Sequence, residues 1–218
     1  IGYYRKAFEI QSKLKDRRGM GQTLSSIGTC YYAQNNLDSS LYYHQASLDT
    51  FKVGKMDSGI AQSLCNTGDI LLLKKNFKDA LKFYTEALQI RIKTEEQYGL
   101  AITYNNLAKV YTELNNWFEA EKNFKLAWES AHEINSSFLK SEIYQARAVM
   151  YEKKGDFKNA FKDINKYYQI KDSLYSNEKS KVISELQERY NAEKAENELL
   201  IKNNQIQSLE KEKRLNQL

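Results

Sequence analysis

Apolar positions along this chain recur with the period of an amphipathic helix. In one stretch they follow one another at spacings of three and four residues, which places them on a single helical face. The positions that mark this face are Ala101, Tyr104, Leu107, Ala108 and Tyr111. A polar pair then interrupts the pattern, and a second apolar run follows through Trp117, Ala120, Phe124, Ala127 and Trp128. Two such runs joined by a short polar turn predict a helical hairpin.

The hairpin pattern repeats at an offset of 40 residues without a gap. The registers that show it are Gly28, Gly68, Ala108 and Ala148; Tyr31, Leu71, Tyr111 and Tyr151; Ser40, Ala80, Ala120 and Ala160; and His44, Tyr84, Phe124 and Ile164. A single hairpin buries only a narrow stripe, so several must stack to make a continuous core. We therefore predict an array over residues 1–175. It consists of a half repeat at 1–18 and hairpins at about 20–58, 60–98, 100–138 and 140–175.

The small residues and the polar pairs have expected local roles. Glycine or alanine on the first helix lets the backbones approach while an aromatic side chain on the second helix fills the space. The polar pairs are expected to end the first helix with a left-handed residue and to cap the second. These pairs are Asn35–Asn36, Lys75–Asn76, Asn115–Asn116 and Gly155–Asp156. We expect Gly19, Gly59 and Gly99, also 40 apart, to mark the turns between hairpins, with Gly19–Gly21 as one such turn.

These residues carry a resemblance to the tetratricopeptide repeat (TPR). The apolar, small and aromatic positions of the first helix, such as Leu24, Ile27, Gly28 and Tyr31, resemble its consensus, and four registers agree. The usual TPR period is shorter and closes with a proline, whereas this chain contains no proline. The longer period, which we attribute to a longer second helix, looks like the variants of kinesin light chains and bacterial sensor proteins. The resemblance implies an all-α superhelix, an α-solenoid of helical hairpins, whose first helices line a concave groove.

Counting along the first helices gives the residues that the resemblance places in this groove. They are Gln22, Ser25, Thr29, Tyr32, Gln62, Asn66, Asp69, Asn105, Asn106, Lys109, Glu142 and Gln145. Asn66 and Asn106 directly precede the Thr67–Gly68 and Leu107–Ala108 pairs. In peptide-binding TPR relatives an asparagine there holds the peptide backbone, because a carboxamide offers both a donor and an acceptor. Hydrogen bonds between neighbouring hairpins are the alternative role for both residues, and the sequence leaves the two open.

From about residue 176 the 40-residue register ends and the composition shifts to Glu, Lys, Asn and Gln. The spacing of Val182, Ile183, Leu186 and Tyr190 predicts a capping helix. The sparser stripe over residues 192–218 fits a coiled-coil seam, so we expect a long C-terminal helix and a homodimer through this segment; a solvated, fraying helix is the alternative. The segment also resembles the connector that follows TPR arrays in sensor histidine kinases and helix-turn-helix regulators of Bacteroidetes-type bacteria.

Composition and candidate chemistry narrow the function further. The net charge of +5 is spread over 33 basic and 28 acidic side chains, so we expect no nucleic-acid binding by this segment. The two cysteines and two histidines form no catalytic or metal-binding set, so we expect no catalytic residues, no metal and no cofactor. His44 occupies an aromatic core position and is expected to be a packed histidine; His132 falls in the last turn of a second helix.

The combined prediction is a non-catalytic ligand- or peptide-binding sensor module of a bacterial signalling protein, which relays binding through its C-terminal helix. The alternative is a constitutive scaffold for protein–protein interaction. A third hypothesis, a peptide-controlled regulator of the Rap type, would need a helical bundle N-terminal to the array. The resemblance favours the periplasmic face of the inner membrane and leaves the cytoplasm open. Membrane attachment is expected only through sequence outside this segment, because the segment has no long apolar run.

Overall fold

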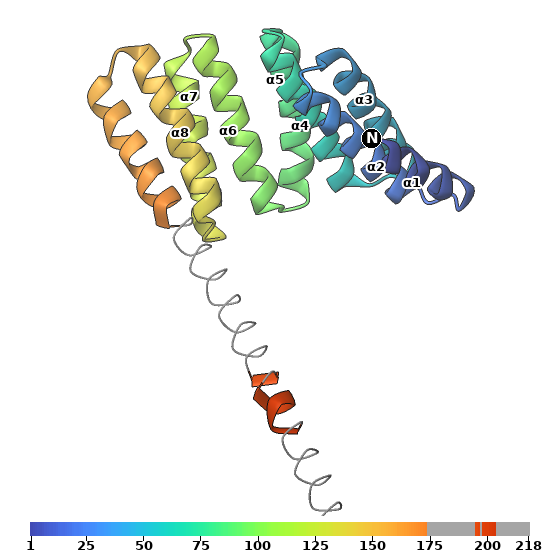
Figure 1. The fold of residues 1–218 in the computed structure, drawn as a ribbon. Coiled ribbons are helices and arrows are strands. Elements are labelled where there is room, and N and C mark those ends of the chain that lie inside the picture. Colours follow the sequence, from blue (N-terminus) through green and yellow to red (C-terminus); the bar gives the residue numbers. More distant parts are fainter. Residues whose placement is uncertain (174–194, 197, 204–218) are drawn as a thin grey trace, which may run out of the picture. The chain divides into compact units, whose positions relative to one another are not determined.

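The computed structural model describes residues 1–173, 195, 196 and 198–203, and all regular secondary structure among them is helical. The named helices are α1 (Gly2–Lys13), α2 (Arg17–Ala33), α3 (Leu37–Val53), α4 (Asp57–Leu73), α5 (Phe77–Lys93), α6 (Gln97–Glu113), α7 (Trp117–Glu133) and α8 (Ser137–Lys154). Residues 157–170 are also helical and complete the last hairpin. Figure 1 shows the helices stacked side by side in chain order. The predicted all-α fold of stacked helical hairpins is therefore confirmed.

The chain divides into two compact units, Ile1–Ile170 and Lys171–Leu218. In the second unit, residues 171–173, 195, 196 and 198–203 are helical and exposed. The predicted capping positions at 182–190 and most of the predicted dimer seam at 192–218 lie outside the described residues. Among the residues that are described, no helix combines the length and apolarity needed to cross a bilayer.

The polar pairs inside the hairpins behave as the sequence predicts. Asn35, Lys75 and Asn115 have φ between 55° and 58°, and Gly155 has φ 82°. The residue after each left-handed asparagine or lysine caps the next helix: the side chains of Asn36, Asn76 and Asn116 accept hydrogen bonds from the backbone N–H three residues later. Each turn thus ends one helix and starts the next within three residues.

The expected role of Gly19, Gly59 and Gly99 as turns between hairpins is wrong. All three lie in the first turn of α2, α4 and α6, and Gly21 also lies inside α2. The left-handed residues between hairpins come four positions earlier, at Lys15, Lys55, Glu95 and Asn135, with φ of 50–56°. The glycines serve close packing instead: a Cβ on Gly59 would lie 2.5 Å from Phe51 Cδ1, and one on Gly99 would lie 2.5 Å from Arg91 Nε.

The left-handed residues therefore recur every 20 residues, once after each helix of a hairpin. The six helices α2 to α7 each contain 17 residues. The attribution of the long period to the second helix alone is consequently wrong, because both helices of a hairpin have the same length.

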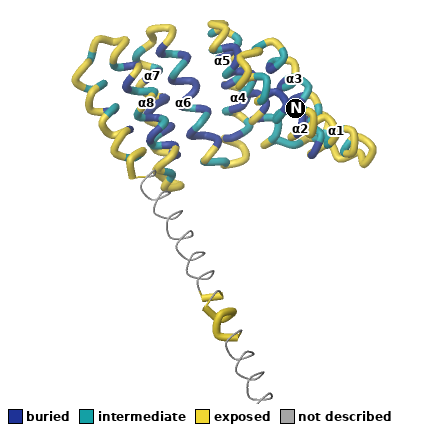
Figure 2. Tube along the Cα trace, viewed as in Figure 1, coloured by how far each residue is buried: buried dark blue, intermediate teal, exposed yellow. Residues whose placement is uncertain are grey.

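The core follows the predicted registers. A Cβ on Gly28 would lie 2.8 Å from His44 Nε2, and one on Gly68 would lie 2.7 Å from Tyr84 Cε1. The small residue of the first helix thus makes room for the large residue of the second, as predicted. Figure 2 shows buried residues concentrated in the middle of the array, where α6 has ten of them, and exposed residues on α1, which has none. The core also continues from one hairpin to the next, since one buried cluster includes Leu48 of α3, Tyr84 of α5 and Leu107 of α6.

Candidate binding groove

The first helices of successive hairpins are neighbours in the array: α2 contacts α4, α4 contacts α6, and α6 contacts α8. Two hollows are shared by α4, α6 and α8. The larger, of about 460 Å³, lies between the end of α4, the start of α5, and helices α6 and α8. The smaller, of about 200 Å³, lies between α4, α6 and α8. Both are lined by Lys109 and Glu142, so we treat them as one groove, which we call the α4–α6–α8 groove.

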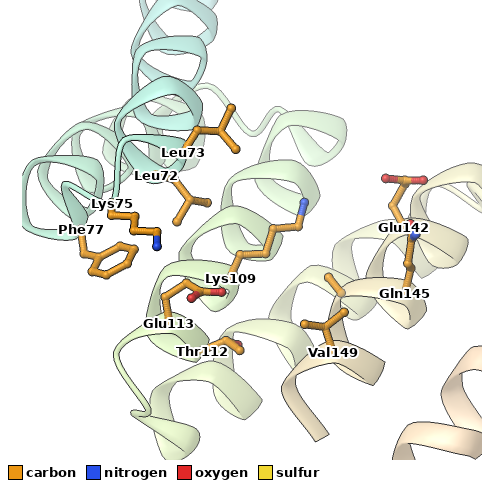
Figure 3. A pocket seen from close by; sticks show the side chains of 11 residues that line it. Leu72, Leu73, Lys75, Phe77, Lys109, Thr112, Glu113, Glu142, Gln145 and Val149 are labelled. Carbon is orange, nitrogen blue, oxygen red and sulfur yellow. The ribbon is translucent and has the colours of Figure 1, made fainter. Parts of the chain in front are cut away.

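The larger hollow has an apolar wall with charged residues around it. Its apolar side chains are Leu72, Leu73, Phe77, Ala146 and Val149. Leu73 and Val149 are 52% and 43% exposed, which is high for aliphatic residues. Figure 3 shows Leu72, Lys75 and Phe77 on one side, Lys109 on α6 in the middle, and Glu142, Gln145 and Val149 of α8 on the other. A concave apolar surface with a few polar groups is the usual form of a ligand site.

Half of the predicted groove residues line this groove. They are Asp69, Asn105, Asn106, Lys109, Glu142 and Gln145. Three more, Gln22, Ser25 and Gln62, line a separate and more polar hollow of about 760 Å³ beside the turn between α3 and α4. The Thr29 hydroxyl donates to the Ser25 carbonyl oxygen within α2, and Tyr32 is 42% exposed. The predicted set is thus divided between two surfaces of the array.

Asn66 and Asn106 both bond to the neighbouring hairpin. Asn66 Nδ2 lies 3.2 Å from Ser25 Oγ and 3.3 Å from His44 Nδ1. Asn106 Nδ2 donates to Asp69 Oδ1 at 2.9 Å, while its Oδ1 accepts from Lys109 Nζ at 3.4 Å. In this structure, then, each carboxamide links two hairpins, which is the second of the two roles that the sequence left open.

Asp69 brings a carboxylate into the wall of the groove. Its Oδ1 accepts hydrogen bonds from the Tyr84 hydroxyl at 2.6 Å and from Asn106. Burial raises the pKa of Asp69, whereas the Tyr84 hydrogen bond and the charges of Lys109 and Arg91 oppose that rise. Burial, helped by the Asp69 charge, also raises the pKa of Tyr84. Three elements, α4, α5 and α6, are therefore joined at one acidic oxygen.

Asn105 differs from the other asparagines because its Oδ1 has no hydrogen-bond partner among the described residues, although Asn105 is only 6% exposed. Leaving a buried carbonyl oxygen unpaired costs about 1–3 kcal/mol. Asn105 lines the smaller hollow together with Asn106 and Glu142. An unpaired acceptor in the wall of a hollow is a natural place for a ligand donor.

A buried polar chain, which the sequence did not predict, connects the second and third hairpins. Arg91 on α5 is 1% exposed and donates to the Gly99 carbonyl oxygen at 2.5 Å and to Thr103 Oγ1 at 2.6 Å. Its Nη2 donates to Gln62 Oε1 at 3.2 Å, and Gln62 Nε2 donates to Asn66 Oδ1 at 2.7 Å. The positions 40 residues before and after Arg91 are phenylalanine and alanine, so the repeat gives no signal for it.

The two histidines occupy the predicted places. His44 is 3% exposed, and burial lowers its pKa to about 4, so the expectation of a packed histidine is confirmed. His132 lies in the last turn of α7 and stacks on Trp128, with 4.7 Å between ring centroids. Burial raises the pKa of the Cys65 thiol to about 11, which disfavours a reactive thiolate. The described residues hold no group of His, Cys, Asp and Glu that could bind a metal ion.

Comparison with known proteins agrees with this architecture. Family models described as tetratricopeptide repeat match residues 61–91, 100–137 and 141–173. The second, third and fourth hairpins therefore match tetratricopeptide repeats. The array is thus a repeat module of the type that binds proteins and peptides. A search of curated proteins finds no match.

Solved TPR structures share the fold. BtubC from P. vanneervenii superposes with a TM-score of 0.66 at 18% identity, covering 79% of this chain and 72% of that protein. Aspartyl phosphate phosphatase F from Bacillus subtilis gives 0.64 at 14% identity and 78% coverage of this chain. A Rap protein complexed with Competence and Sporulation Factor gives 0.62 at 14% identity and 80% coverage of this chain. This chain spans 54% of the phosphatase and 58% of the Rap protein, and at such identities the likeness shows the fold alone.

Proposed function

We propose that this TPR array is a non-catalytic module that binds a peptide or protein segment in the α4–α6–α8 groove. The observation that carries the proposal is the groove itself, in which an apolar hollow of about 460 Å³ adjoins a smaller one with a mixed polar and apolar lining. Partly exposed aliphatic side chains such as Leu73 and Val149 gain from being covered, since burial of apolar area drives association. That a structural neighbour was solved in complex with Competence and Sporulation Factor supports this use of the fold.

The same proposal includes a sensing role in a bacterial signalling protein, where binding in the groove is relayed through residues 171–218 to an output domain. Neighbouring hairpins of an array are held only by their shared interfaces. In this groove the interfaces include the Asn106–Asp69 hydrogen bond, which lies in the wall where a ligand would bind. A ligand that prefers one arrangement of α4, α6 and α8 shifts the population of array shapes toward it.

The groove is tested by binding with two matched variants. Short random peptides are selected on the purified chain by display, and the selected sequences are synthesised with a fluorescent label. Val149→Arg places a charged chain in the larger hollow, whereas Ile92→Arg makes the same change at an aliphatic residue on α5 that is 54% exposed. We expect Val149→Arg to weaken binding at least about tenfold and Ile92→Arg to leave it unchanged. Equal affinity of both variants and the wild type would disprove groove binding.

The sensing role is tested separately by small-angle scattering of the whole chain with and without a selected peptide. A sensor should change its scattering profile when the peptide saturates the groove, and Val149→Arg should abolish that change. A constitutive scaffold would bind the peptide with the profile unchanged. This second outcome would keep the binding module and remove the relay.

A further inference from the structure

The charges around the α4–α6–α8 groove are not evenly paired. Glu113, which lines the larger hollow, pairs with Lys153 at 2.6 Å, and Glu121 on α7 pairs with Lys154 of α8 at 2.7 Å. Glu142, in contrast, has no ion pair or hydrogen bond among the described residues, yet it lines both hollows. A half-buried carboxylate without a partner at the junction of two hollows attracts a cation.

Two further acceptors point to the same kind of ligand. Asn105 Oδ1, in the smaller hollow with Glu142, is buried and has no donor. Asp69 lines that hollow as well, and the side-chain hydrogen bonds that it accepts from other described residues, Tyr84 and Asn106, are both made to its Oδ1. The three residues come from three different helices, α4, α6 and α8. The smaller hollow is therefore rich in acceptors, which a ligand group with several N–H donors can bind in addition to Lys109.

Lys109 limits where such a donor group can bind. Its ammonium lies 3.4 Å from Asn106 Oδ1, and its charge favours the ionised form of the buried Asp69 carboxylate. It therefore offsets the acidic side chain of α4 and leaves Glu142 as the carboxylate of the groove without a partner among the described residues. Lys75, a cation of the larger hollow that likewise has no ion pair among them, lies beside Phe77, on the side opposite Glu142 (Figure 3). A cationic ligand group should consequently bind on the α8 side of the groove, close to Glu142 and Asn105.

The apolar hollow adds a second requirement for the ligand, besides the cationic group. It adjoins the acceptor-rich hollow through Lys109 and Glu142, and its wall includes Leu72, Phe77 and Val149. An occupant that fills both hollows must carry an apolar group next to a cationic one. Adjacent side chains of an extended peptide meet this requirement, because a peptide supplies both groups a few ångströms apart together with backbone N–H donors.

We infer that the groove selects an extended peptide segment in which an apolar side chain enters the 460 Å³ hollow and a neighbouring cationic group pairs with Glu142 beside Asn105. The inference rests on the proposed function and adds the ligand class to it. The cationic group can be a lysine or arginine side chain within a protein segment or the N-terminal ammonium of a free peptide. Both present several N–H donors with a positive charge.

The test uses the labelled peptides from the display selection and three charge variants of the whole chain. Glu142→Gln removes the charge at nearly constant shape, and Glu142→Lys reverses it. Glu133→Gln makes the first change at an exposed residue of α7 outside the groove. We expect the selected peptides to carry an apolar residue beside a cationic group. We expect Glu142→Gln to weaken their binding about tenfold, Glu142→Lys to weaken it further, and Glu133→Gln to leave it unchanged.

Changes in the peptide complete the experiment. Replacing its basic residue with glutamine should erase the difference between the wild type and Glu142→Gln, which would show that the two groups pair. If N-terminal acetylation, and not that replacement, erases the difference, the partner is the ammonium of a free peptide, and the inference also stands. If Val149→Arg abolishes binding but Glu142→Gln leaves it unchanged, the inference about the cationic group is wrong and the proposed groove remains. Binding that neither variant alters overturns both.

Discussion

Burial of His44 makes the stability of the array depend on pH in a defined window. The side chain is 3% exposed, packs against Gly28, and has its Nδ1 3.3 Å from Asn66 Nδ2. Burial lowers its pKa from 6.5 to about 4. In the unfolded chain the imidazole takes up a proton as the pH falls below 6.5, whereas the folded chain resists protonation until about 4. The free energy of unfolding should therefore decrease as the pH falls from 6.5 to about 4, and His44 should cause no further decrease at lower pH.

The size of this effect follows from the pKa difference. A lowering of the pKa from 6.5 to about 4 corresponds to about 3 kcal/mol of stability, the full amount being present at neutral pH. Carboxylates titrate in the lower half of the same window, so the wild type alone does not isolate His44. His44→Phe provides the comparison, because Phe124 occupies the same position two repeats later.

Urea unfolding followed by circular dichroism, from neutral pH down to about 4, measures both proteins. We expect the wild type to lose about 3 kcal/mol more than His44→Phe over this window. At neutral pH the variant should lose only about 1 kcal/mol, because Asn66 Nδ2 keeps its bond to Ser25. Parallel curves for the two proteins would refute the reasoning, as would an NMR titration that places the pKa of His44 at its ordinary value.

Two further changes test the packing and the ion pair inside the array. Gly99→Ala should lower the free energy of unfolding by about 1–3 kcal/mol, because the new Cβ would meet Arg91 at 2.5 Å; Gly2→Ala, with nothing within 4 Å, is the matched control and should not destabilise. Asp163→Ala should lower the free energy of unfolding by about 3 kcal/mol, because it removes the two carboxylate oxygens that lie 2.6 and 2.9 Å from the Arg147 guanidinium. Adding Arg147→Met removes the charge left without a partner and should restore part of this stability. Thermal unfolding measures the stability of Gly99→Ala, Gly2→Ala, Asp163→Ala and the double variant against the wild type. Equal stability of Gly99→Ala and Gly2→Ala would contradict the packing explanation. A double variant that loses as much stability as Asp163→Ala alone would contradict the ion-pair explanation.

The 40-residue register was enough to predict the hairpins, because each repeated position meets the same neighbours in every hairpin. The glycines were misinterpreted for a physical reason: glycine is used both for left-handed turns and for close helix packing, and the sequence does not distinguish them. The turns between hairpins instead use residues such as Lys55 and Glu95, with φ of 51° and 52°. Lysine and glutamate are not residue types that predict a left-handed conformation.

The groove was predicted only where helical counting applies. Asp69, Asn106 and Glu142 follow from the face of the first helices, and the structure places them around the hollows. Lys75 and Phe77 also line the larger hollow, but they belong to the turn and the start of α5, which counting along first helices omits. The unpaired state of Asn105 Oδ1 could not be predicted, because it depends on which donors the neighbouring helices place within reach.

The proposed sensing role requires that binding in the groove change the shape of the array, and the hydrogen bonds in the groove wall offer one way for this to happen. Asn106 lines the smaller hollow and at the same time joins α6 to α4 through its bond to Asp69. A peptide N–H that competes for the Asp69 carboxylate, or a carbonyl that competes for the Asn106 amide, must weaken or replace this link. Because Asp69 also accepts from Tyr84 on α5, the change reaches the second helix of the same hairpin. The interface between the second and third hairpins is therefore the part of the array whose geometry ligand binding should alter most.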